Sequence, residues 1–294
     1  MEEKKRDQIA GLLIGQGFLL VLILIGMLIA GSHATRVYAA SINVDDQGTD
    51  SPTCGSPDTP CRTIPYALAN RVVAGDTIFV WAGTFTETIT LRAGVIISGA
   101  GTADTFIDGE GVRGPMVTAT GSTIDPSTVL RGVTVRGGTA TNGGGIYIAD
   151  AASPLIENCE VSGNVATSSG GGLYVFQTNA LTLRDTVVMS NTAARQGGGM
   201  YQTYVGGSRL DLFGGRFENN ETTENNGGGL WIFGTVAMTG TEFINNRAAY
   251  RGGGFYQTGS TGRAEVTGAL LEGNTANTFF GGGLGVEGTA VLSA

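Results

Sequence analysis

The chain has 294 residues, of which 50 are glycine and only 14% are charged. The glycines follow no Gly-X-Y period, which excludes collagen, and a hydrophobic fraction of 41% argues against a disordered chain. The formal net charge of -8, with no basic cluster, argues against nucleic acid as a partner.

Residues 1–39 are expected to direct export. A charged start, MEEKKRDQ, precedes an uncharged stretch of 22 residues, 9–30, which is long enough to span a bilayer. Positive charges before the stretch favour export of the residues after it. Small residues in VYAA, 37–40, fit a signal peptidase site. The segment predicts either a cleaved signal peptide or an uncleaved signal-anchor helix, so residues 40–294 are expected to be secreted or at the cell surface. Membrane contact is expected only through an uncleaved anchor.

The exported part lacks two residue types on which many enzymes depend. Lysine occurs only at Lys4 and Lys5, and histidine only at His33. This excludes a Ser-His-Asp triad, a histidine zinc site, a lysine Schiff base and a P-loop lysine beyond residue 40. We expect no cofactor and no metal. DDQGTD, 45–50, has oxygen ligands that calcium accepts, but without periodic ligand spacing it is interpreted as a polar loop.

Two cysteines enclose a turn-rich loop, CGSPDTPC. In an exported chain, Cys54 and Cys61 are expected to form a local disulfide. Cys159 lies in a column of small residues and is expected to be a packed thiol rather than a nucleophile.

A short helix is expected after the second cysteine. Thr63 can cap its first turn, Pro65 suits that turn, and Ile64, Ala67 and Leu68 give it one apolar side. Such a helix would close the open end of a solenoid.

A Gly-Gly-Gly run begins six times, and the starts are separated by 27, 27, 30, 25 and 29 residues: Gly143, Gly170, Gly197, Gly227, Gly252 and Gly281. In all copies but the last, an aromatic residue follows: Tyr147, Tyr174, Tyr201, Trp231 and Tyr256. An asparagine precedes each later run: Asn164, Asn191, Asn220, Asn246 and Asn274. Columns held at such a period indicate stacked structural repeats.

Each repeat contains short strand-like pieces and no helical period. A unit of about 27 residues suits one coil of a three-faced parallel β-helix. We therefore predict an all-β fold for residues 40–294: a single-stranded parallel β-helix with three short strands per coil, a capping helix and one continuous domain. The repeats begin at about residue 140. Because GTAVLSA, 288–294, stops before the last face of a coil, we expect the solenoid to continue beyond the given sequence.

The repeated columns have different expected roles. Glycine allows positive φ and close approach of neighbouring coils at a corner. The asparagines are expected to form an inward hydrogen-bonded ladder. The aromatic row is expected to face outward, either as a binding platform or as a cover for the sheet.

The columns resemble the polymorphic outer membrane protein repeat. FENN, 217–220, and FINN, 243–246, match its FxxN element, and GGGI and GGGL are similar to its GGAI element. VSGN, VMSN and LEGN keep the asparagine but lack the phenylalanine. The resemblance covers about residues 140–294 and implies a β-helix that serves as an adhesive surface passenger.

Residues 61–109 are similar to the opening of pectin-lyase-like β-helix proteins, which implies a right-handed coil. Several such proteins cleave polysaccharides, with an arginine or lysine base or with paired carboxylates. Asp185, Arg209 and Asp211 form the best catalytic cluster that the sequence offers, but we interpret them as solvated surface charges with weak ion pairs. The histidine common in pectinolytic hydrolases of this fold is absent.

We therefore expect a non-catalytic, exported β-helix protein that acts in binding or adhesion, with surface glycan or protein as its partner. The alternative is a polysaccharide lyase or glycoside hydrolase.

Overall fold

The fold is that of a computed structural model, which describes residues 39–293 apart from 111, 179, 260 and 279–280, and apart from the side chains of 204–207. The expected signal or anchor segment therefore lies, except for Ala39, outside the described residues. Within the described part, no helix combines the length and the hydropathy needed to cross a bilayer. Residues Ala40–Ala294 cluster as one unit.

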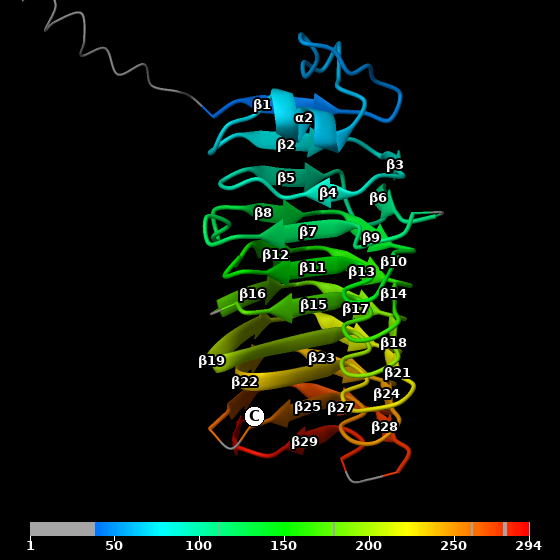
Figure 1. Ribbon diagram of the computed structural model, residues 1–294, viewed down its shortest axis with the longest axis vertical. Coiled ribbons are helices and arrows are strands. Elements are labelled where there is room, and N and C mark those ends of the chain that lie inside the picture. Colours follow the sequence, from blue (N-terminus) through cyan, green and yellow to red (C-terminus); the bar gives the residue numbers. More distant parts are fainter. Residues whose placement is uncertain (1–38, 111, 179, 260, 279–280, 294) are drawn as a thin grey trace, which may run out of the picture. The chain divides into compact units, whose positions relative to one another are not determined.

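The chain of this unit winds into coils whose strands stack in parallel (Figure 1). Each coil passes through up to four stacks of strands, which we number in the order that the chain meets them after a glycine run. Two of these stacks join into one 16-stranded sheet, and the other two form sheets of eight and six strands.

In the first stack, each strand from residue 146 onward directly follows a glycine run. Its strands are β4 (Ile89–Thr90), β7 (Val117–Thr120), β11 (Ile146–Ala149), β15 (Leu173–Phe176), β19 (Met200–Phe213), β22 (Leu230–Thr239), β25 (Phe255–Thr258) and β29 (Leu284–Val286).

The second stack begins at the N-terminal end of the unit. It contains β1 (Ser41–Val44), β2 (Thr77–Val80), β5 (Ile96–Gly99), β8 (Val129–Arg131), β12 (Leu155–Glu157), β16 (Ala180–Arg184), the later parts of β19 and β22, β26 (Arg263–Thr267) and β30 (Thr289–Ser293). Because β19 and β22 run through the corner without a break, the first and second stacks become one sheet there.

The third stack carries the residues that precede the asparagine column. Its strands are β3 (Gly83–Phe85), β6 (Thr105–Asp108), β9 (Thr134–Arg136), β13 (Glu160–Ser162), β17 (Val187–Met189), β20 (Arg216–Glu218), β23 (Glu242–Ile244) and β27 (Leu270–Glu272). The fourth stack consists of two-residue strands: β10 (Thr139–Ala140), β14 (Val165–Ala166), β18 (Thr192–Ala193), β21 (Glu221–Thr222), β24 (Arg247–Ala248) and β28 (Thr275–Ala276).

The fourth stack corrects the expectation of three strands per coil. A two-residue strand is too short to show the alternation of apolar and polar residues by which a strand is recognised. Figure 1 shows these short strands one below another along the right-hand side of the coils.

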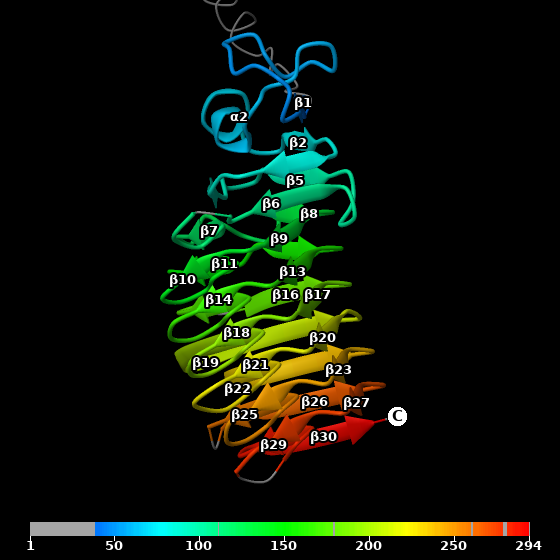
Figure 2. The ribbon, with the colours of Figure 1, turned by 90° about the vertical axis from the view of Figure 1, so that its right-hand side faces the viewer.

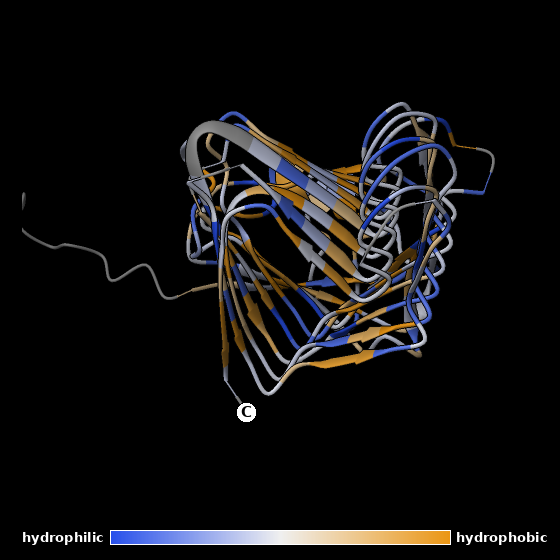
Figure 3. Cartoon of the chain, turned by 90° about the horizontal axis from the view of Figure 1, so that it is seen from below, coloured by the Kyte–Doolittle hydropathy of each residue, from blue (hydrophilic) through white to orange (hydrophobic). Residues whose placement is uncertain are grey.

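The core fills the inside of the coils, where apolar columns run from rung to rung. Viewed along the coils, hydrophobic segments recur at the same place in successive strands (Figure 3). Phe217 lies directly over Phe243, with ring centroids 5.0 Å apart. The inward residues that follow the first five glycine runs are all at most 1% exposed: Ile146, Leu173, Met200, Leu230 and Phe255. Cys159 is buried in the same core.

The helix α2 (Ile64–Asn70) packs at the N-terminal end of the coils (Figures 1 and 2). The Oγ1 atom of Thr63 accepts a hydrogen bond from the backbone N–H of Tyr66 at 3.2 Å, and Pro65 lies in the first turn. Its buried side is made of Ile64, Ala67 and Leu68, so the helix covers apolar core that would otherwise face water.

The glycine runs turn the chain into the first stack. The first glycine of each run has φ between 60° and 88°. The following glycines lie against the next coil: a Cβ at Gly198 would stand 2.5 Å from the carbonyl oxygen of Gly228. No side chain fits at such a distance, so the spacing of the coils itself requires glycine here.

Candidate binding site: the aromatic column and its surroundings

Five aromatic residues follow one another on the outward side of the first stack, and we call them the aromatic column. The parallel register places Tyr147 beside Tyr174, Tyr174 beside Tyr201, Tyr201 beside Trp231, and Trp231 beside Tyr256. Their neighbours at the preceding position point into the core, which turns the aromatic side chains outward because side chains alternate along a strand.

Four rings of the column form a continuous stack. The centroid distances are 5.4 Å from Tyr147 to Tyr174, 5.0 Å from Tyr174 to Tyr201, and 4.7 Å from Tyr201 to Trp231. The interplanar angles are only 9° to 12°. Each inner ring therefore touches a neighbouring ring on both faces, and the column offers mainly ring edges and hydroxyl groups to solvent.

Tyr256 is not part of this stack. The sequence predicts five outward rings in a row, and the structure shows four. Tyr256 is only 5% exposed, and its hydroxyl donates to the carboxylate of Glu287 and accepts from Nη1 of Arg251. Its ring lies where a side chain of Gly285 would stand, because a Cβ added there would come within 2.6 Å of Cδ2 of Tyr256. This explains why the last repeat has glycine in the aromatic position.

The two inner tyrosines of the stack, Tyr174 and Tyr201, have raised pKa values. Burial raises the pKa of Tyr174 to about 12, and the neighbouring hydroxyls of Tyr201 and Tyr147 add to the shift. Burial also raises the pKa of Tyr201. The hydroxyls of Tyr174 and Tyr201 therefore stay neutral over the physiological range, where each can both donate and accept a hydrogen bond.

A hollow of about 1150 Å³ lies at the N-terminal end of the column. Tyr147 forms part of its wall, together with residues 109–115 apart from 111 and the polar side chains of Thr139 and Asn142. The segment between β6 and β7 projects from the coils on the side of β10 (Figure 1). The sequence reasoning missed this site. Its only signal is that 109–116, ahead of the repeats, combines glycines and a proline with charged residues.

The asparagines lie inside the coils and form a ladder. The Nδ2 atom of Asn164 donates to Oδ1 of Asn191 at 3.0 Å, and each later asparagine repeats this bond with its successor, through Asn220 and Asn246 to Asn274. The first four are fully buried. Because these groups bond to one another and to backbone, they have a structural role and do not contact a ligand.

The charged cluster considered for catalysis does not form. Arg209 and Asp211 pair with each other, with Nη2 and Oδ1 2.8 Å apart. The register places Asp211 beside Thr182. Asp185 lies three residues beyond Thr182, which is about 10 Å further along the strand direction at the rise of a strand. Asp185 occupies the turn after β16 at φ 45°. The sequence suggested proximity because the two segments lie on adjacent rungs, but the strand separates the side chains.

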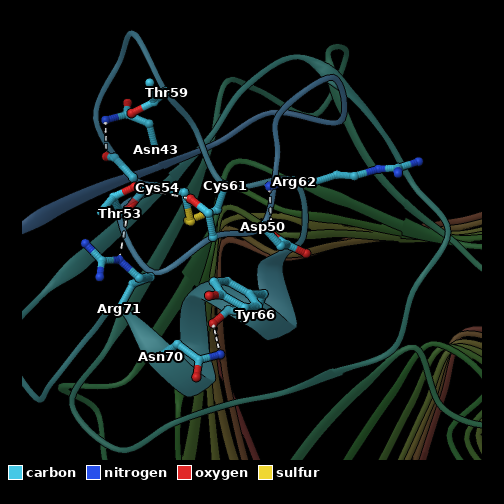
Figure 4. Close-up of a disulfide and its surroundings, with 12 residues drawn as sticks. Asn43, Asp50, Thr53, Cys54, Thr59, Cys61, Arg62, Tyr66, Asn70 and Arg71 are labelled. Carbon is cyan, nitrogen blue, oxygen red and sulfur yellow. Dashed lines mark hydrogen bonds between the residues drawn. A yellow bond between two sulfur atoms is a disulfide. The ribbon is translucent and has the colours of Figure 1, made fainter.

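Cys54 and Cys61 are joined by a disulfide (Figure 4). Asp50 lies near both sulfur atoms, but disulfide sulfur is not available as a metal ligand, so these three residues do not form a metal site. The Asp50 carboxylate instead accepts hydrogen bonds from the backbone N–H of Arg62 at 2.8 Å and from the hydroxyl of Thr63 at 2.8 Å. It anchors the start of α2 from the loop 45–50.

Cys159 has no reactive character. Its burial raises the pKa of the thiol to about 12, and its sulfur lies 3.4 Å from the carbonyl oxygen of Leu130. A thiol that keeps its proton and is shielded from solvent cannot serve as a nucleophile.

The chain shows similarity to known proteins. A solved structure described as "Pectin methylesterase from Carrot" is similar, with a TM-score of 0.46 and 11% identity over 86% of this chain and 90% of that chain. No curated protein matches the sequence. The family described as "Right handed beta helix region" matches residues 92–248, which is more than half of the 294 residues. The chain thus belongs to the family of right-handed β-helix proteins.

Proposed function

We propose that residues 40–294 are an exported, non-catalytic binding module of the cell surface, and that the aromatic column contacts its partner. The observation that carries the proposal is the ring stack from Tyr147 to Trp231. Four large, half-buried rings lie in line on an outward face, one per coil. Aromatic side chains with one apolar and one polar end are favoured contact groups for glycan and protein partners.

The N-terminal segment and the repeats support the surface location. The apolar stretch 9–30 with its positive start is the expected export signal or anchor. The FxxN-like elements at 217–220 and 243–246, similar to the polymorphic outer membrane protein repeat, support a role in adhesion. An elongated solenoid with one contact residue per coil suits an extended partner, such as a surface glycan chain.

The alternative, a polysaccharide lyase or glycoside hydrolase, has less support. Acid-base hydrolysis needs two carboxyl groups that face one substrate bond. Asp185 and Asp211 are separated along the strand, and Asp211 is neutralised by Arg209.

The test removes the rings and leaves the fold. The triple variant Tyr174→Ser, Tyr201→Ser and Trp231→Ser should keep its β-type circular dichroism spectrum and lose binding to cell-surface glycan or envelope preparations. Each ring contact contributes about 0.5 to 1.5 kcal/mol beyond its buried area, so the loss should be measurable. As a matched control, Phe79→Ser and Phe213→Ser remove two exposed aromatic residues outside the column.

Two results would contradict the proposal. Equal binding by the triple variant and the control would limit the column to covering the sheet. Release of reducing ends or unsaturated uronate from a polysaccharide, abolished by Asp185→Asn or Asp211→Asn, would establish an enzyme instead.

A further inference from the structure

The two ends of the ring stack differ from its middle. Tyr174 and Tyr201 each have an aromatic ring on both sides. Tyr147 has a ring on one side only, since the register places the small Thr118 of β7 beside it on the other. One face of Tyr147 is therefore uncovered by any ring of the column, and Tyr147 lines the hollow of about 1150 Å³.

Residues 109–115, apart from 111, form one wall of the hollow. One backbone hydrogen bond joins this wall to the coils, and another lies within it. The N–H of Gly114 donates to the carbonyl oxygen of Thr139 at 2.9 Å, and that of Val112 to the carbonyl oxygen of Gly109 at 2.9 Å. Asp108, just before the wall, accepts from Nε of Arg136 at 2.7 Å and from the N–H of Glu110 at 3.1 Å. Hydrogen bonds to Arg136 of β9 and Thr139 of β10 therefore hold this wall in place against the coil.

The polar groups of the hollow carry both signs and have unused hydrogen-bonding capacity. In the part of the chain that the structure describes, the guanidinium of Arg113 and the carboxylate of Glu110 take part in no ion pair. Asn142 accepts the N–H of Ser169 at 3.2 Å through Oδ1, which orients its amide, and its Nδ2 has no partner among the described residues. Hydroxyls of Thr139 and Thr167 complete the lining.

We infer that this hollow binds an uncharged oligosaccharide, one sugar ring of which stacks on the free face of Tyr147. A sugar ring combines an apolar C–H face, which suits an aromatic ring, with hydroxyls that both donate and accept. Arg113 and Asn142 supply donors, Glu110 supplies an acceptor, and the opposite charges of Arg113 and Glu110 cancel, which favours a neutral ligand over an acidic one. The volume slightly exceeds the roughly 300 to 1,000 Å³ usual for ligand sites, so the hollow has room for several sugar rings. This inference rests on the proposed binding function and locates it at one end of the column.

The experiment compares Tyr147 with an exposed aromatic residue outside the column. The full chain is titrated by calorimetry with a panel of neutral oligosaccharides (gluco-, galacto- and manno-oligosaccharides) and with oligogalacturonate. Tyr147→Ser should weaken the binding of the neutral ligand about tenfold. Phe213→Ser, which removes an exposed ring outside the column, should leave it within about twofold. Arg113→Gln and Glu110→Gln should each weaken it by several fold.

A second variant avoids any change in the stack itself. Thr118→Tyr extends the stack by one ring and covers the free face of Tyr147, so it should block binding while all native rings remain. Unimpaired binding by Thr118→Tyr would overturn the inference.

The failures of this inference and of the proposed function are distinguishable. Unimpaired binding of the neutral ligand by Tyr147→Ser would refute the hollow as the site and leave the column, which the triple variant tests, as the proposed binding surface. Binding of oligogalacturonate but of no neutral oligosaccharide would refute the inference that the ligand is uncharged. Absence of binding to every glycan of the panel by the wild-type chain would contradict the inference, whereas the proposed function would then be decided by the envelope-binding assay.

Discussion

Asn191 is bonded to Asn220 of the next rung through both its side chain and its backbone. Its Nδ2 atom donates to Oδ1 of Asn220 at 3.0 Å, and its backbone N–H donates to the same oxygen at 3.1 Å. The Nδ2 atom also donates to the carbonyl oxygen of Val161 at 2.8 Å. Both asparagines are 0% exposed, so no water can replace these bonds, and the ladder fixes the corner between the third and fourth stacks.

Replacement of Asn191 by Leu should therefore destabilise the coil. The substitution removes the acceptor of the backbone N–H of Asn164, one of the two acceptors of its Nδ2 atom, and the side-chain donor to the carbonyl oxygen of Val161, all in a buried site. We expect the free energy of unfolding to fall by about 1 to 3 kcal/mol, measured by denaturant titration. Asn246→Leu should behave alike, whereas Asn277→Leu, at an exposed position after β28, should have little effect. An unchanged midpoint for Asn191→Leu and Asn246→Leu would show that the ladder contributes nothing.

The glycine columns give a second prediction with a control from the same column. A Cβ at Gly199 would lie 2.5 Å from the carbonyl oxygen of Gly229 and 2.9 Å from Cγ of Asn220. The equivalent Cβ at Gly283, in the last described rung, would have its nearest neighbour at 3.5 Å. Gly199→Ala should therefore cost at least about 1 to 3 kcal/mol by overpacking, and Gly283→Ala should be tolerated. Equal thermal midpoints for the two variants would disprove that coil spacing selects glycine.

Glu87 gives a prediction about pH. Burial raises the pKa of its carboxyl from 4.5 to about 7; the hydrogen bond from the N–H of Ile64 opposes this rise, and the charge of Asp50 adds to it. Between pH 4.5 and about 7 the folded chain holds a proton that the unfolded chain has released, so stability from this group is present at low pH and is lost as the pH rises.

The measurement compares the wild type with Glu87→Gln across this window. Glutamine keeps an acceptor for Ile64 but does not titrate. Allowing for solvent screening of a half-buried group, we expect the wild type to lose about 1 to 2 kcal/mol relative to the variant between acidic and neutral pH. Parallel curves of unfolding free energy against pH for the two proteins would rule out a raised pKa at this position.

Several features of the fold could be predicted from local sequence. The recurrence of glycine runs and asparagines indicates a solenoid, because coils that stack in register must repeat the same turn at the same place. The capping of α2 by Thr63 also follows from local sequence, since it depends on residues within one turn.

Other features were decided only by the tertiary structure. The distance between Asp185 and Asp211 depends on the register of β16 against β19, which joins residues almost thirty positions apart and shifts with each change of repeat length. The position of the Tyr256 ring depends on Gly285, one rung away, because a side chain there would occupy the space of the ring. The hollow beside Tyr147 arises where the irregular segment 109–115 meets the start of the fourth stack. Sequence periodicity determined which residues share a column in this protein. Only the packing of successive coils decided which ring faces stay uncovered, because that depends on contacts between rungs and not on the pattern within one.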